Sequence, residues 1–214
     1  MLVDLSITEF LEKTAAGSAT PGGGSVAALT AACAAGLAEM VANLTIGKAG
    51  YRSSEADMKS LAEQSRHLRD ELVRNIDRDS EAYGEVLAAF KLPKETEKQK
   101  QKRNQAIQRA FMRATSVPLK VAKDALQVLI LAGTAAENGN KNTVTDAAVA
   151  ALIAKSALLS AVYNVKVNLN AIRDEGFLKD VLFQVAALEK EALEKEKEIL
   201  STVDKSLCSA AGAI

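Results

Sequence analysis

Three consecutive glycines, directly before a helical segment, are the first candidates for chemistry. They lie in the run TPGGGS at residues 20–25, which leads into an alanine-rich stretch. Consecutive glycines cost backbone entropy, and they are typical of positive φ or of a backbone that closely approaches another group. At a helix N-terminus their free N–H groups can bind a carboxylate, a phosphate or an amide oxygen. A flexible turn with Ser25 as the N-cap is the alternative.

Asp79 is a carboxylate within an apolar helical stripe. It lies one turn after Ile76 and one turn before Tyr83. A carboxylate in such a position must be paired, hydrogen-bonded or protonated, because an isolated buried charge is costly. The structural interpretation is a buried ion pair or a hydrogen bond between helices. The functional interpretation is a proton-transfer group that faces a cleft.

Residues 139–146 and two later asparagines form a third polar group. Asp146 falls in the first turn of a helix, where a carboxylate commonly acts as a cap. Asn164 and Asn168 are four residues apart and therefore share one face of an otherwise apolar helix. Buried amides need hydrogen-bond partners, which here are either neighbouring helix backbones or a ligand with its own hydrogen-bonding edge.

Several classes of catalytic site are disfavoured because the sequence lacks their residues. His67 is the only histidine, and Cys33 and Cys208 are far apart. Zinc and dithiol sites need such ligands in close groups, and no Ser-His-Asp or Cys-His arrangement emerges. We therefore expect no metal, no cofactor and no acyl-enzyme chemistry. Cys33, which lies among alanines, is interpreted as an inert core residue.

The elements that must position these residues are helices. Aromatic residues make up 4% of the chain, good helix formers dominate, and no period-two alternation is sustained. We expect an all-α, single-domain bundle over residues 1–214, and Ser6 with Glu9 predicts a capping box at its first helix. The long apolar helix that contains Asn164 is expected to be central. About seven helices are predicted, at residues 6–17, 25–45, 54–90, 96–118, 119–137, 143–172 and 177–207.

Charge and hydropathy restrict the classes of partner that we expect the protein to bind. Lys and Arg together number 27, as do Asp and Glu, so no global positive field favours nucleic acid. Residues 26–46 are long enough to span a bilayer, but Glu39 and many alanines favour a helix buried inside protein. Two distant cysteines and residues 1–10 without a secretory signal lead us to expect a cytoplasmic protein that neither spans membranes nor binds nucleic acid.

The small residues of the second predicted helix allow its backbone to approach another helix closely. Alanine and glycine provide little side-chain bulk at positions 27–38. That surface can lie inside one chain or between two chains, and the sequence does not choose between them; we expect some of both.

The sequence resembles the formiminotetrahydrofolate cyclodeaminase / methenyltetrahydrofolate cyclohydrolase family. The motifs that carry the resemblance are TPGGGSVAA at residues 20–28 and MVANLTIGK at residues 40–48, followed by Tyr51. Their order and spacing are specific. Shorter matches extend the resemblance over nearly the whole chain: Asp79 with Ala82-Tyr83, Leu92-Pro93-Lys94, Gly139-Asn140 with Asp146, and Asn164-Val165 with Asn168-Leu169. Thr145 stands where the family pattern leads us to expect serine, which keeps the hydroxyl.

The resemblance implies a helical homodimer that acts on one-carbon derivatives of tetrahydrofolate. One reaction of the family hydrolyses 5,10-methenyltetrahydrofolate to 10-formyltetrahydrofolate, and we favour it for this chain. The other cyclises the N5-formimino group with loss of ammonia. A non-catalytic scaffold or folate-binding protein is the third alternative.

Roles for individual residues follow from the matched positions and from this chemistry. Both reactions pass through a cationic carbon and a tetrahedral adduct, and they need proton transfer and a stabilising negative charge. Asp79 is the principal candidate and Asp146 the second, with Lys48 or Lys94 assisting proton transfer or binding carboxylates. The substrate-binding candidates are Pro21, Gly22, Gly23, Gly24, Ser25, Asn140, Asn164 and Asn168.

Overall fold

The computed structural model describes the backbone of residues 1–211 and the side chains of residues 1–208. Within this part of the chain the structure is helical and has no strand, which confirms the predicted all-α class. The capping box at Ser6 and Glu9 is also present. The α-helices are α1 (Ile7–Ala15), α2 (Gly23–Asn43), α3 (Glu55–Phe90), α4 (Glu97–Asn138), α5 (Val144–Leu169) and α6 (Glu175–Ala211). Three short 3-10 segments are η1 (Leu2–Asp4), η2 (Ala49–Ser54) and η3 (Lys141–Thr143).

The described chain has six α-helices instead of about seven, because α4 continues through Pro118. Proline has no N–H and leaves the carbonyl four residues earlier without its helical partner. Here that carbonyl belongs to Ala114, and it accepts a hydrogen bond of 2.9 Å from Nδ2 of Asn168 in α5. A side chain from a neighbouring helix therefore satisfies the group that proline leaves free.

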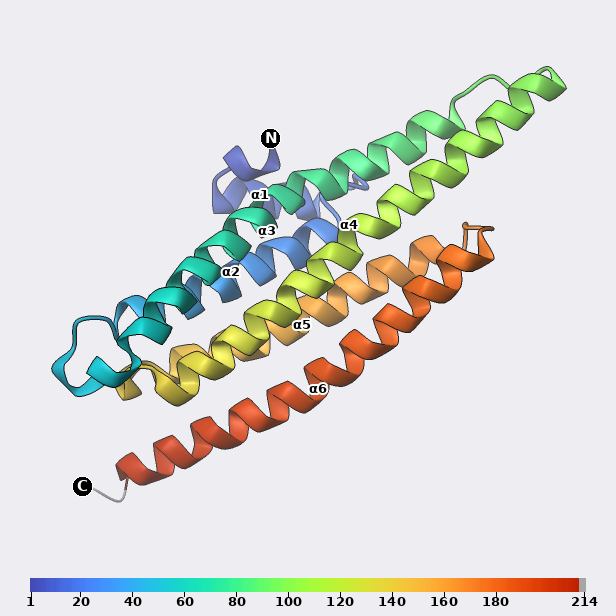
Figure 1. The fold of residues 1–214 in the computed structure, drawn as a ribbon. Helices are drawn as coiled ribbons and strands as arrows, with labels where there is room; N and C mark the ends of the chain where they lie inside the picture. Colours follow the sequence, from blue (N-terminus) through green and yellow to red (C-terminus); the bar gives the residue numbers. More distant parts are fainter. Residues whose placement is uncertain (212–214) are drawn as a thin grey trace.

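The five long helices lie side by side in an elongated bundle (Figure 1). α2 packs against α3, α4 and α5, and α6 packs against α4 and α5. Twelve of the 21 residues of α2 are buried, eight of them alanines. The small side chains let the longer helices approach its backbone, so the close packing predicted for this segment occurs inside the chain.

The second helix begins earlier than the sequence predicts. Gly22 is the N-cap, so Gly23 and Gly24 belong to the first turn, and Ser25 is not the cap. The prediction placed these glycines in a loop because glycine is a poor helix former. Their contacts, described below, explain why small residues are needed in this turn.

α5 is not enclosed on all sides within one chain. It packs against α2, α4 and α6, but it leaves an apolar stripe exposed. This outward stripe consists of Val149, Leu152, Tyr163 and Val167, whose exposures range from 41% to 73%. Cys33, predicted as an inert core residue, is also exposed, on α2.

Two segments are long and apolar enough to cross a membrane, namely Gly23–Asn43 and Lys141–Leu169. Core helices of globular proteins pass the same test. In this structure the apolar residues of α2 fill the interior of the bundle.

The bundle has two ends that matter for the site. The glycine end contains the start of α2, the end of α5 and the middle of α3, where Gly24, Asn164 and Asp79 lie close together. The Asn140 end contains the end of α2, η2 and the start of α5. Beyond the glycine end, α3 and α4 continue as a hairpin that projects from the rest of the molecule (Figure 1).

Candidate active site

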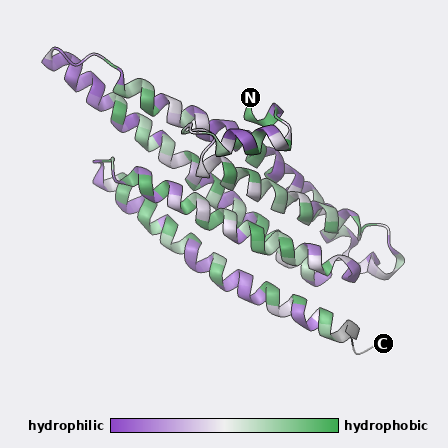
Figure 2. Ribbon diagram, turned by 180° about the vertical axis from the view of Figure 1, so that it is seen from behind, coloured by the Kyte–Doolittle hydropathy of each residue, from purple (hydrophilic) through white to green (hydrophobic). Residues whose placement is uncertain are grey.

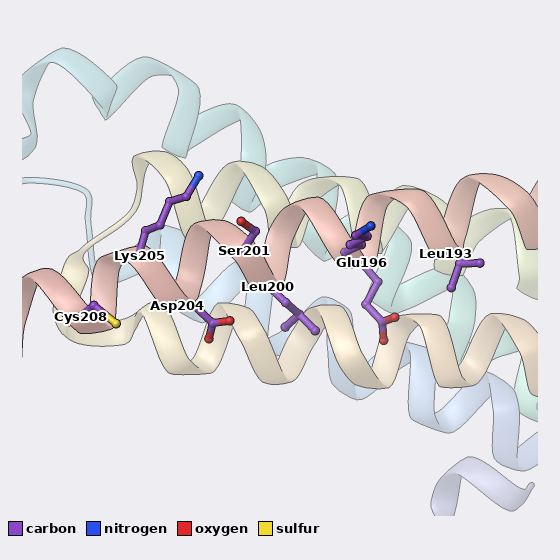
Figure 3. A pocket seen from close by; sticks show the side chains of 8 residues that line it. Leu193, Glu196, Leu200, Ser201, Asp204, Lys205 and Cys208 are labelled. Atoms are coloured by element: carbon purple, nitrogen blue, oxygen red, sulfur yellow. The ribbon is translucent and has the colours of Figure 1, made fainter.

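A cleft of about 300 Å³ lies at the glycine end. The segment before α2 and the helices α2, α3, α4 and α5 all contribute to its walls. Its lining residues are Ala19, Thr20, Gly22, Gly23, Gly24, Asp79, Tyr83, Ala114, Asn164, Val167 and Asn168. Larger hollows exist, and the largest of those found, about 780 Å³, runs along α6 (Figure 3). That groove is lined by one helix alone, whereas the cleft brings together polar groups that are distant in sequence.

Asp79 is the only ionisable carboxyl group among the residues that line the cleft. Oδ2 lies 3.1 Å from the Ser25 hydroxyl, which is also 2.9 Å from the Ile76 carbonyl oxygen. A hydroxyl has a single proton and can donate to only one of these acceptors at a time. Burial raises the pKa of the Asp79 carboxyl above its ordinary value, and hydrogen bonding from the Ser25 hydroxyl and backbone N–H partly opposes this rise. The carboxyl group is therefore easier to protonate than an exposed aspartate.

Close approach explains the glycines in the first turn of α2. A Cβ atom on Gly24 would lie 2.0 Å from Oδ1 of Asp79, and one on Gly23 would lie 3.2 Å from Nδ2 of Asn164. Neither glycine has positive φ; Gly47 is the described residue that does. Of the two uses predicted for these glycines, the structure shows close approach.

The start of α2 also provides unused donors. The first hydrogen bond within the helix runs from the Val26 N–H to the Gly22 carbonyl at 3.1 Å. The N–H groups of Gly23 and Gly24 have no partner inside the helix, and both residues line the cleft. They can donate to an oxygen atom of a ligand.

Asn164 and Asn168 present acceptors to the cleft. Their Nδ2 groups donate to the Ser160 and Ala114 carbonyls, each at 2.9 Å. Within the described chain the two Oδ1 atoms have no hydrogen-bond donor. The cleft therefore combines one carboxyl group, two amide oxygens and two backbone donors.

The remaining predicted residues lie elsewhere. Pro21 and Ser25 are buried behind the cleft wall, and Ser25 contacts Asp79 from that side. Lys48 and Asp146 lie toward the Asn140 end of the bundle. Asp146 is eighteen residues from Asn164 along α5, which corresponds to about 27 Å. Lys94 is exposed in the connection between α3 and α4.

Asn140 is buried and its polar atoms are used by the protein itself. Its backbone N–H donates to the Thr45 hydroxyl at 2.8 Å, and Nδ2 donates to the Leu44 carbonyl at 3.2 Å. Oδ1 accepts from the Asn142 N–H. These bonds join the end of α2 to η3.

Tyr83 lines the cleft but is not among the predicted site residues. It follows Asp79 by four residues on α3 and is 39% exposed. The apolar stripe led to its interpretation as a core residue. The spacing of four from Asp79 is the signal that places both side chains on one face.

The chain is similar to known proteins over most of its length. Residues 6–187 match the family described as "Formiminotransferase-cyclodeaminase". The chain belongs to this family. The resemblance predicted from the sequence motifs is thus confirmed.

Relatives of the chain within the family have two different names. A methenyltetrahydrofolate cyclohydrolase of Methylorubrum extorquens is 41% identical over 198 residues, which cover 92% of this chain and 95% of the relative. A formimidoyltransferase-cyclodeaminase of Rattus norvegicus is 32% identical over 203 residues, which cover 95% of this chain and 38% of the relative. A crystal structure of formiminotetrahydrofolate cyclodeaminase from Thermotoga maritima superposes with a TM-score of 0.88 at 30% identity. It covers 97% of this chain and 100% of that structure.

Proposed function

We propose that the chain catalyses the hydrolysis of 5,10-methenyltetrahydrofolate to 10-formyltetrahydrofolate. The observation that carries the proposal is the Asp79 carboxyl group in the cleft wall, held against Gly24 and the Ser25 hydroxyl. Identity of 41% with a methenyltetrahydrofolate cyclohydrolase over nearly the full length of both proteins supports the choice of reaction.

The proposed hydrolysis needs one side chain that can be either ionised or protonated in the cleft. The methenyl carbon carries a delocalised positive charge, which an ionised Asp79 stabilises. Water adds to this carbon as its proton is removed, and a tetrahedral adduct forms. The hydroxyl of the adduct then loses its proton to solvent as the C=O bond forms, the bond between this carbon and N5 breaks as N5 receives a proton, and the formyl group stays on N10. A carboxyl group with a raised pKa can accept the first proton and return one to N5.

The polar groups around Asp79 suit a pterin. The ring carries an amino group and ring N–H donors, for which the Oδ1 atoms of Asn164 and Asn168 provide acceptors. The unused N–H groups of Gly23 and Gly24 suit an oxygen atom of the substrate. Tyr83 provides an aromatic face at the cleft wall. These steps use groups of the protein alone, so we expect turnover without an added metal or cofactor.

Formiminotetrahydrofolate cyclodeaminase activity is the second candidate. The similarity to the Thermotoga maritima cyclodeaminase structure over its whole length favours it. In this reaction N10 attacks the formimino carbon and ammonia leaves, so a proton again has to be moved beside a cationic carbon. The same Asp79 would serve both reactions.

We further propose a homodimer that forms through α5. The outward stripe has apolar residues toward both ends of the helix with the exposed Ser156 and Ser160 between them, and no side chain of the described chain covers it. If two copies of α5 pack antiparallel about a two-fold axis, the start of one lies near the end of the other. Asp146 and Lys48 of a second copy would then approach the cleft, and both remain catalytic candidates in this arrangement.

Two assays test the function. The purified protein is treated with a chelator and given 5,10-methenyltetrahydrofolate while loss of its absorbance is followed. Separately, it is given formiminotetrahydrofolate while ammonia is measured. We expect turnover in the first assay. Ammonia release alone would establish the cyclodeaminase instead, and inactivity in both would favour a non-catalytic folate-binding protein or scaffold.

A further inference from the structure

Ser25 carries a fully buried hydroxyl group between two helices. It lies near the start of α2, and its exposed fraction is 0%. Its Oγ is 3.1 Å from Oδ2 of Asp79 and 2.9 Å from the Ile76 carbonyl oxygen. The Ser80 hydroxyl lies 3.3 Å away. All three partners belong to α3, so this hydroxyl fixes α2 against the helix that carries the candidate catalytic carboxyl group.

The two acceptors near Ser25 allow it to serve both forms of Asp79. The Ile76 carbonyl lies inside α3, where the N–H group four residues later donates to it. An ionised carboxylate is the stronger acceptor, so the Ser25 proton goes to Oδ2 when Asp79 is ionised. When Asp79 is neutral, the same proton can turn to the Ile76 carbonyl. The hydroxyl therefore keeps a hydrogen bond in both states, as a fully buried polar group requires.

The contact with Ser25 also distinguishes the two oxygens of the Asp79 carboxyl group. Oδ2 is directed at Ser25, which lies behind the cleft wall. Oδ1 is the oxygen nearer to the position of a Cβ on Gly24, a residue that lines the cleft. No side-chain donor of the described chain reaches Oδ1. One oxygen is thus anchored by the protein, and the other is left for a ligand or water.

No charged side chain lines the cleft beside Asp79. The lining residues from α2, α4 and α5 are uncharged, and Tyr83 on α3 is the other titratable one. Asp77, two residues earlier on α3, accepts instead from the Leu2 N–H. Charged residues are frequent at the tip of the α3–α4 hairpin, which is strongly hydrophilic in Figure 2. Within the described chain, Ser25 is therefore the polar side chain that acts on the Asp79 carboxyl group.

We propose that Ser25 is a positioning residue that anchors Oδ2 of Asp79, so that Oδ1 takes the proton from water and returns it to N5. The proposal rests on the proposed function, because it uses the proton-transfer role of Asp79 described above. Donation to Oδ2 also favours the ionised form of Asp79, which stabilises the cationic carbon of the substrate. Ser25 lies behind the cleft wall and acts on the reaction through Asp79.

The first measurement does not require turnover. The carboxyl carbon of Asp79 is titrated by carbon-13 NMR in protein labelled at aspartate, and Asp79→Asn identifies its signal. The variants are Ser25→Ala, which removes the hydroxyl, and Ser25→Cys, which keeps a small side chain with only a weak donor. Ser65→Ala is the matched control, because Ser65 is also fully buried on α3 but its Oγ has no hydrogen-bond partner in the described chain.

We expect the pKa of Asp79 to rise by about one pH unit in both Ser25 variants, because a hydrogen bond to the charged form is lost. The control should leave this pKa unchanged. With 5,10-methenyltetrahydrofolate as substrate, kcat of the Ser25 variants at neutral pH should fall about tenfold to hundredfold with little change in KM. The acid limb of their pH profile should move to higher pH by the same amount as the pKa.

Two results would overturn the proposal. One is an Asp79 pKa that is the same in the original protein and in the Ser25 variants. The other is a fall in kcat that is equal at all pH values, because a general packing defect has that effect. If the pKa rises in the Ser25 variants but the original protein shows no turnover, the proposed function fails while the anchoring of Oδ2 stands.

Discussion

Asp79 occupies a position where its ionised form is unfavourable, and this has a consequence for stability. Burial raises the pKa of its carboxyl group in the folded chain above the ordinary value of 3.8. Between the two pKa values the folded state binds more protons than the unfolded state. The contribution of Asp79 to stability is therefore complete below pH 3.8 and falls as the pH rises through the folded-state pKa.

Asp79→Asn removes this titration. The variant is expected to unfold at a higher temperature than the original protein at neutral pH, and the difference should shrink as the pH falls toward 3.8. Thermal unfolding followed by circular dichroism at several pH values measures it. A difference in unfolding temperature that does not change with pH would show that burial does not perturb Asp79.

Gly24 is a second residue with a specific prediction. In Gly24→Ala the new methyl group would overlap Oδ1 of Asp79, so either α2 or Asp79 has to move. We expect a loss of about 1–3 kcal/mol in the free energy of unfolding, together with most of the activity. The matched control is Gly84→Ala in α3, where a Cβ meets no atom within 4 Å.

The control is expected to be stabilised by roughly 0.5–1 kcal/mol, because alanine is the better helix former. Urea denaturation of both variants provides the comparison. Equal stabilities of Gly24→Ala and Gly84→Ala would rule out the close packing between Gly24 and Asp79.

The residue types predicted the main polar groups of the cleft but not its full set of lining residues. The glycines are unfavourable within a helix, and Asp79 and the two asparagines are polar residues on apolar helix faces. The structure brings all of them together in one cleft. The contact between Ser25 and Asp79 could not be predicted from the sequence, because it forms only when α2 packs against α3. Tyr83 was missed because an aromatic residue on an apolar stripe has the pattern of a core residue.

At the scale of elements, α4 depends on α5. Pro118 removes a donor from inside α4, and the amide of Asn168 replaces that donor at the Ala114 carbonyl. The sequence predicted a helix break at Pro118 because proline signals only the loss of a local bond. The compensating residue is fifty positions later, and no local pattern links the two.

A double-mutant cycle tests this dependence. Asn168→Ala should cost about 1–3 kcal/mol, because it leaves the Ala114 carbonyl without a donor. In the Pro118→Ala background the backbone N–H of residue 118 can satisfy that carbonyl, so the same change should cost clearly less. The free energies of unfolding of the four proteins give the coupling. Additive effects would contradict the compensation.

At the scale of the molecule, the exposed stripe on α5 is the surface through which we expect two chains to form a dimer. Leu152→Glu places a charge within this stripe, and we expect it to convert a dimer into a monomer of 22.6 kDa. Leu182→Glu is the control, since Leu182 on α6 is similarly exposed but lies outside the stripe. Light scattering during size-exclusion chromatography measures the mass. If the Leu152→Glu protein is still a dimer, the interface does not lie on the stripe of α5.

The helical class of the whole molecule followed from composition and periodicity, but its shape did not. Helix patterns specify which face is apolar without specifying what covers that face. The α5 sequence is apolar nearly all round and predicted a central helix, yet one stripe stays exposed in the single chain.

The most direct test of the central claim is the rate at which the protein converts 5,10-methenyltetrahydrofolate, measured by its absorbance for the original protein and for Asp79→Asn. Circular dichroism confirms that the variant keeps its helices. We expect steady turnover by the original protein and a rate indistinguishable from the uncatalysed reaction for the folded variant. A folded Asp79→Asn protein that retains the original rate would remove Asp79 from the mechanism.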